Sequence, residues 1–168
     1  VEGGTGFAKA AGNYAGALYP AQLAQNNGYR QLIWTDALEH KYIEEAGTMN
    51  VIFQIGDTLI TPKSSDTILA SITRRSVIDI ARDWGYKVEE RKVLVSEVIE
   101  AIEAGNLCEA FGAGTAATIA QISLINYEGV DYELPPVENR EFSNKVKQEI
   151  DNIKYGKIED RFNWMLKV

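Results

Sequence analysis

The sequence predicts an α+β fold in which mixed β-sheets are flanked by helices. Apolar residues recur at helical spacing over residues 70–84 and again over residues 141–155. Residues 51–55 and 58–61 are apolar, β-branched segments separated only by Gly56 and Asp57, which is typical of a β-hairpin. The 168 residues are enough for one domain that buries roughly two thirds of its unfolded surface.

Composition narrows the classes of partner. The net charge is −7, with 24 acidic and 17 basic residues, which argues against a nucleic-acid or anionic-membrane surface. No apolar run approaches the length of a membrane span. The single cysteine, Cys108, excludes an internal disulfide, indicates a reducing compartment such as the cytoplasm, and is expected to be a buried core thiol. With one cysteine and one histidine, no zinc site is expected.

The first thirteen residues are rich in glycine and alanine and contain one cation, Lys9. Glycine lets the backbone approach other groups closely, so Lys9 is a candidate for presentation to a ligand; the alternative is a solvated loop lysine. The spacing Gly-Thr-Gly-x-x-Lys lacks the Gly-Lys-Ser/Thr ending of a phosphate-binding loop. The chain starts with Val1 and carries no leader, so we expect it to begin within a longer protein.

The next elements follow from turn and capping signals. We predict a helix over residues 14–27 that ends at Gly28, with Pro20 either kinking it or marking its true start. A strand over 31–35 leads into a polar turn over 36–41 that exposes His40. After the 51–61 hairpin, the helix over 70–84 is capped by Thr67 or Ser71, carries an apolar stripe that includes Ile72, and ends at Gly85.

The second half alternates strands and helices. We predict an exposed strand over 87–93, a helix over 96–104, and two strands on either side of a glycine turn at residues 112–114. An irregular linker over 132–140 precedes a helix over 141–155 with its apolar stripe on one face, and the tail at 161–164 packs back on the domain.

Residues 42–50 read Tyr-Ile-Glu-Glu-Ala-Gly-Thr-Met-Asn and place two adjacent carboxylates before an apolar strand. Side chains alternate along a strand, so we expect only one of Glu44 and Glu45 to face inward. A buried carboxylate needs a cationic or hydrogen-bonding partner because burying it alone is costly. The alternative is that both glutamates are solvated at a strand end.

Three blocks occur in the order typical of one family: Gly-Thr-Gly-Phe-Ala-Lys-Ala-Ala-Gly-Asn-Tyr (4–14), Glu-Glu-Ala-Gly-Thr-Met-Asn (44–50) and Glu-Ala-Phe-Gly-Ala-Gly-Thr-Ala (109–116), with a weaker block at 68–76. The chain thereby resembles the large C-terminal domain of branched-chain amino acid aminotransferases, class IV enzymes that use pyridoxal 5′-phosphate. The resemblance implies the fold type IV architecture of the D-amino acid aminotransferase-like enzymes, with mixed sheets forming a pseudo-barrel. It also implies that residues 1–168 are the cofactor-binding domain and that a smaller N-terminal domain is absent.

The same resemblance implies roles for particular residues. Lys9 corresponds to the lysine that forms the Schiff base and moves a proton between the amino acid Cα and the cofactor C4′, a task that requires the lowered pKa of a buried lysine. Glu45, rather than Glu44, corresponds to the partner of the protonated pyridine nitrogen, and Tyr14 to the phenol facing the ring hydroxyl. The backbone amides of Ile72 and Thr73 and the Thr115 hydroxyl correspond to donors to the cofactor phosphate. Ser71, where the family often has glycine, is expected to cap the helix. Thr48 and Ala116 correspond to positions that line the substrate carboxylate.

The function implied by this resemblance is transfer of the amino group of leucine, isoleucine or valine to 2-oxoglutarate, in branched-chain amino acid biosynthesis, by a homodimer. In the family, the smaller domain supplies an arginine to the phosphate and much of the side-chain pocket, so the chain alone is expected to be inactive. Two alternatives remain open: another class IV enzyme, such as a D-amino acid transaminase or an aminodeoxychorismate lyase, and a non-catalytic module in which Lys9 and the Ile72 helix start merely hold a phosphate ligand.

Overall fold

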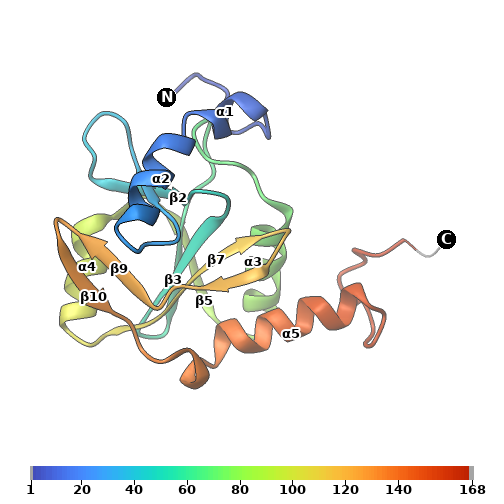
Figure 1. Ribbon diagram of the computed structural model, residues 1–168. Helices are drawn as coiled ribbons and strands as arrows, with labels where there is room; N and C mark the ends of the chain where they lie inside the picture. The colour runs from blue at the N-terminus through green and yellow to red at the C-terminus, as the bar shows by residue number, and fades with distance from the viewer. Residues whose placement is uncertain (1, 167–168) are drawn as a thin grey trace.

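The computed structural model describes residues 2–166, which form three sheets and five α-helices (Figure 1). The strands are β1 (Ile33–Thr35), β2 (Tyr42–Ala46), β3 (Asn50–Ile55), β4 (Thr58–Pro62), β5 (Lys87–Arg91), β6 (Val93–Leu94), β7 (Leu107–Gly114), β8 (Thr118–Gln121), β9 (Leu124–Tyr127) and β10 (Val130–Glu133). The helices are α1 (Ala11–Ala15), α2 (Leu18–Asn26), α3 (Ile72–Asp83), α4 (Val95–Glu103), α5 (Phe142–Lys154) and the short 3-10 helix η1 (Val137–Asn139). None of the described helices is long and apolar enough to cross a bilayer.

The central sheet has the order β5-β4-β3-β7-β8, and a second sheet has the order β1-β2-β6. The predicted hairpin is confirmed, with Phe53 opposite Ile60 in antiparallel β3 and β4. Helix α3 carries the chain from β4 to the parallel strand β5, as a parallel pairing requires. The predicted α+β class is therefore confirmed, although the described strands leave the central sheet open, with β5 and β8 as its edges, rather than closing a barrel.

Two apolar clusters hold these layers together. One packs β7 and β8 against α3 and α5 and includes Ile80, Phe111 and Phe142; the other packs β3 and β7 against α4 and includes Phe53 and Val98. The α5 stripe is buried as predicted, and the tail packs on the first cluster through its aromatic rings. Figure 1 shows α1 and α2 at the end of the molecule opposite α5.

Helix boundaries agree with the capping signals, with two differences. Ser71 caps α3 by accepting a hydrogen bond from the Arg74 amide at 3.2 Å. The residue that follows this cap, Ile72, is 67% exposed, so the buried stripe of α3 begins one turn later than predicted. The single helix predicted over 14–27 is two helices, α1 and α2, with Pro20 in the first turn of α2, where its missing amide costs nothing.

Two predictions for β7 are wrong, for related reasons. Cys108 is exposed rather than buried, because the register of β7 shifts between the pairs Glu109–Gln54 and Leu107–Ile55 and leaves Cys108 without a partner on β3. The glycine turn predicted at 112–114 is part of the strand, and the real turn is at 115–117. A Cβ at Gly114 would lie 2.7 Å from Cγ of Met49, so glycine here permits close packing rather than a turn. The predicted linker over 132–140 contains the end of β10 and η1.

A buried carboxylate fixes the start of α5 to β7, and a buried arginine lies beside it. Glu109, 3% exposed, accepts 2.8 Å hydrogen bonds from the backbone amides of Phe142 and Ser143 at the start of α5. Arg140, also 3% exposed, donates to backbone oxygens of Ala110 and other residues beside it. The carboxylate thus satisfies two helix-terminal amides that have no intrahelical acceptor.

We expect Glu109→Gln to lower the free energy of unfolding by about 1–3 kcal/mol, because the neutral amide caps the two α5 amides less strongly and leaves Arg140 without its buried counter-charge. The neighbouring exposed substitution Cys108→Ser should stay within about 0.5 kcal/mol. Urea unfolding of both variants is the measurement. Equal stability for the two would contradict the anchoring role of Glu109.

Candidate functional site

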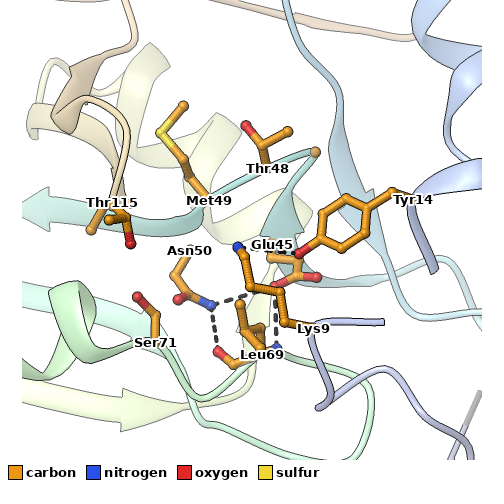
Figure 2. Close-up of a pocket in the computed structure, with 12 residues that line it drawn as sticks. Lys9, Tyr14, Glu45, Thr48, Met49, Asn50, Leu69, Ser71 and Thr115 are labelled. Carbon is orange, nitrogen blue, oxygen red and sulfur yellow. Dashed lines mark hydrogen bonds between the residues drawn. The ribbon is translucent and has the colours of Figure 1, made fainter. Parts of the chain in front are cut away.

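A two-residue turn between β2 and β3 forms one wall of an open cleft. Ala46 and Met49 bridge across Gly47 and Thr48, so Glu45 and Asn50 stand on adjoining strands next to this turn. Figure 2 shows Lys9, Tyr14 and Glu45 close together, with Thr115 across the cleft and Thr48 on the turn above them. Its full lining is Lys9, Tyr14, Glu45, Gly47, Thr48, Met49, Asn50, Leu69, Ser71, Ala113, Gly114 and Thr115.

A break in the register between β1 and β2 leaves both Glu44 and Glu45 half-buried. Ile33 faces Ala46 whereas Thr35 faces Ile43, so Glu44 and Glu45 together stand opposite a single residue of β1. Such a bulge interrupts the alternation of side chains. The expectation that one glutamate faces inward and the other outward is therefore wrong, and both are half-buried.

The two carboxylates have different partners. Glu44 accepts a 2.6 Å hydrogen bond from the Thr67 hydroxyl. Glu45 accepts bonds at its Oε2 from the Leu69 amide at 3.3 Å and from the Asn50 side chain at 3.4 Å. Within residues 2–166, Oε1 of Glu45 accepts no hydrogen bond, so one oxygen of this carboxylate remains free to bind a ligand.

The surroundings of Glu45 disfavour its charge. Burial raises the pKa of Glu45 from 4.5 to about 7, and the negative charge of Glu44 adds to this rise. The Leu69 amide and the positive charge of Lys9 lower it again, but by less. A cation or N–H donor placed against the free oxygen would stabilise the charged form, so the site favours a ligand that brings one.

The glycine-rich segment before α1 carries Lys9 to this carboxylate. The Phe7 amide donates to the Asp66 carbonyl oxygen at 3.0 Å, and a Cβ on Gly6 would lie 2.8 Å from Cα of Thr67. The segment therefore lies directly against the loop that Glu44 holds. Nζ of Lys9 lies 3.5 Å from the Tyr14 hydroxyl, as Figure 2 shows. The burial expected for Lys9 is not found, because its side chain is exposed at the mouth of the cleft.

The start of α3 supplies unpaired backbone donors. Nothing in the described part of the chain accepts a hydrogen bond from the backbone amides of Ile72 and Thr73, as is usual in a first helical turn. Such amides and the partial positive charge of the helix end favour an anion. Ser71 and Thr115 add hydroxyl groups to the cleft.

Not every predicted site residue reaches the cleft surface. The side chains of Lys9, Tyr14, Glu45, Thr48 and Thr115 belong to its lining. Ile72, Thr73 and Ala116 do not line it: the first two lie at its edge in the first turn of α3, and Ala116 is exposed in the turn between β7 and β8.

Sequence reasoning assigned no site role to several lining residues, among them Met49, Asn50 and Leu69. Asn50 is 3% exposed and bonds to both Glu45 and the Leu69 carbonyl oxygen. An asparagine that opens an otherwise apolar strand five residues after a glutamate was the available signal. Leu69 contributes through its backbone, which a sequence pattern does not reveal.

Comparisons with known proteins agree on one family. Residues 8–125 match the family described as Amino-transferase class IV. The chain is 41% identical over its full length to a probable branched-chain-amino-acid aminotransferase of Staphylococcus epidermidis and covers 47% of that protein. It is 42% identical over its full length to branched-chain-amino-acid aminotransferase 2 of Bacillus subtilis, covering 46% of it. The chain thus spans about half the length of these curated relatives.

Solved structures show the same fold. The branched-chain aminotransferase of Thermoproteus uzoniensis, crystallised with norvaline, matches with a TM-score of 0.79 and 29% identity, over 96% of this chain and 49% of that one. The PLP-form of the branched-chain amino acid aminotransferase of Thermobaculum terrenum matches with a TM-score of 0.77 and 29% identity, over 96% and 49%. The expected fold type IV architecture is confirmed.

We expect Gly6→Ala to force the Lys9 segment away from the 66–67 loop, because the added methyl group would meet backbone atoms that cannot move aside. The amide of Phe7 should then exchange its hydrogen at least about tenfold faster. Gly12→Ala is the matched control, because a Cβ there meets nothing within 4 Å. Unchanged exchange in Gly6→Ala would contradict the close docking of this segment.

The raised pKa of Glu45 predicts a pH-dependent stability. Between pH 4.5 and 7 the folded state holds a proton on Glu45 that the unfolded state has released, so this residue makes the free energy of unfolding fall as pH rises through that window. We expect Glu45→Gln to remove this fall, so that the variant gains stability relative to the unsubstituted protein from pH 4.5 to 7. The exposed Glu159→Gln should show no such gain. Urea unfolding at several pH values measures the difference, and parallel curves would refute the raised pKa.

Proposed function

The chain belongs to the class IV aminotransferase family, and from this premise we propose that the intact protein transfers the amino group of leucine, isoleucine or valine to 2-oxoglutarate with pyridoxal 5′-phosphate. The observation that carries the proposal is the half-buried Glu45, which has an unbonded Oε1 among the described residues and lines a cleft together with Lys9. The sequence identity to enzymes named for this activity, which extends over the whole of this chain, supports the choice of substrate.

The residues of the cleft suit this cofactor. A carboxylate with a pKa raised to about 7 matches a ring nitrogen that binds as a cation or N–H donor. Ile72, Thr73 and Thr115 would hold the phosphate through two free amides and a hydroxyl, and Tyr14 would meet the ring hydroxyl. When bound, the cofactor supplies an electron sink for the substrate Cα once its proton is removed.

The residues of the chain perform the other tasks. Glu45, ionised beside its ligand, keeps the facing ring nitrogen protonated through charge and hydrogen bonding. Lys9 would hold the cofactor covalently through Nζ; once the substrate amine has displaced it, the freed Nζ amine would be the base that takes the proton from Cα and returns it at C4′. The Tyr14 hydroxyl, 3.5 Å from Nζ, orients that amine. Thr48 and Ala116, at the two turns beside the cleft, would contact the substrate carboxylate.

Further parts of the proposal concern the intact protein. We place this chain as the cofactor-binding domain, with the aliphatic pocket and a phosphate-binding arginine supplied by a smaller domain outside it. The exposure of Lys9 supports this, because a catalytic lysine needs cover from water to act as a base near neutral pH. We also propose a cytoplasmic homodimer whose substrates are amino acids and 2-oxo acids.

Lys9→Ala tests the assignment. In the intact protein we expect it to lower transamination of leucine with 2-oxoglutarate by at least about 10³-fold, because nucleophile and base are lost together. Borohydride reduction with pyridoxal 5′-phosphate, followed by peptide mapping, should attach the cofactor to residue 9 in the unsubstituted protein alone. The exposed Lys63→Ala should retain both properties. Cofactor binding that is largely retained in Lys9→Ala would favour a phosphate-binding module without catalysis.

A further inference from the structure

Two donors converge on one oxygen of the Glu45 carboxylate, and a third hydrogen bond links the two donor residues to each other. The Asn50 Nδ2 group donates to Glu45 Oε2 at 3.4 Å and to the Leu69 carbonyl oxygen at 3.1 Å. The Leu69 amide donates to the same Oε2 at 3.3 Å. Figure 2 shows these three bonds as a closed set on the cleft wall. We call Asn50 with the backbone of Leu69 the Glu45 clamp.

The orientation of the Asn50 amide is dictated by its neighbours. Both of its contacts are acceptors, a carboxylate and a carbonyl oxygen, so the NH₂ group must face them. Its Oδ1 is then buried and meets no donor within the described residues. An unpaired buried oxygen is unfavourable. The two hydrogen bonds that the NH₂ group donates therefore explain the orientation of this amide, and full hydrogen bonding does not.

The clamp leaves a single oxygen for chemistry. Within the described residues every hydrogen bond to the Glu45 side chain falls on Oε2, so Oε1 is unbonded in a residue that lines the cleft. We propose that Asn50 is a positioning residue: it fixes the Glu45 carboxylate in its ionised form, with Oε1 presented to the pyridine nitrogen of the cofactor. This role rests on the function proposed above, which does not itself assign one to Asn50.

The charges around Glu45 explain why a neutral donor is suited to this place. Glu44 on the same strand raises the pKa of Glu45, and Lys9, whose positive charge lowers it, is the residue proposed to bind the cofactor. From β3 and from the loop before α3, the facing groups are Asn50 and Leu69, which carry no charge. Hydrogen bonds to the charged form of a carboxylate oppose the effect of burial without adding a fixed positive charge.

The test is the pH dependence of cofactor affinity in the intact protein, purified free of cofactor and titrated with pyridoxal 5′-phosphate from pH 5.5 to 9. Affinity should fall below a midpoint set by protonation of Glu45. In Asn50→Ala we expect this midpoint to move upward by about one pH unit, because one hydrogen bond to the charged form is lost. Asn50→Asp keeps the size of the side chain and replaces the donor with a like charge, so its shift should be larger.

Gln54→Ala is the matched control. Gln54 lies on the same strand, donates its amide to a backbone oxygen at 3.2 Å, and also leaves a buried oxygen unpaired, but it does not touch Glu45. Its midpoint should match that of the unsubstituted protein, so a general effect of cutting a β3 amide is separated from loss of the clamp. Normal binding with an unmoved midpoint in both Asn50 variants would overturn the inference alone. No binding by the unsubstituted protein would overturn the proposed function as well.

Discussion

The site depends on one electrostatic constraint: a carboxylate held partly out of water with no protein cation bonded to it. Burial raises the pKa of Glu45 to about 7, and the Leu69 amide and the positive charge of Lys9 resist this rise without cancelling it. The apo chain therefore carries an electrostatic cost that a ligand with a protonated ring nitrogen would relieve. This is why a stability measurement and a cofactor-binding measurement both report on the same residue.

The surrounding fold is arranged to hold that carboxylate still. The bulge in β2 turns Glu44 to Thr67 and Glu45 to Leu69, so adjacent residues bind adjacent parts of one loop. The same loop receives the glycine-rich segment that carries Lys9, and it leads directly into the first turn of α3. Lys9, Glu45 and the first turn of α3, to which we assign the nucleophile, the ring partner and the phosphate donors, thus share one short loop as their common support. Small displacements of that loop would misalign all three.

Much of this arrangement could be predicted from the sequence. The 51–61 hairpin, the Ser71 cap and the α5 stripe follow from local patterns. The family resemblance predicted a shared site for five residues that line one cleft in the structure: Lys9, Tyr14, Glu45, Thr48 and Thr115. What could not be predicted depends on long-range contacts. The β2 bulge is set by pairing with β1, the glycines of β7 make room for Met49, and Cys108 is exposed because of the register of β7. The role of Asn50 requires the Leu69 backbone, nineteen residues away, to be folded beside it.

The most direct test of the account is a carbon-13 NMR titration of the Glu45 side-chain carboxyl, with and without pyridoxal 5′-phosphate. The account predicts a pKa near 7 in the cofactor-free protein and, with cofactor bound, a carboxylate that stays ionised well below that value because it faces a protonated ring nitrogen. A pKa near 4.5 that does not respond to the cofactor would contradict it, and would show that Glu45 is a solvated side chain at the end of a strand.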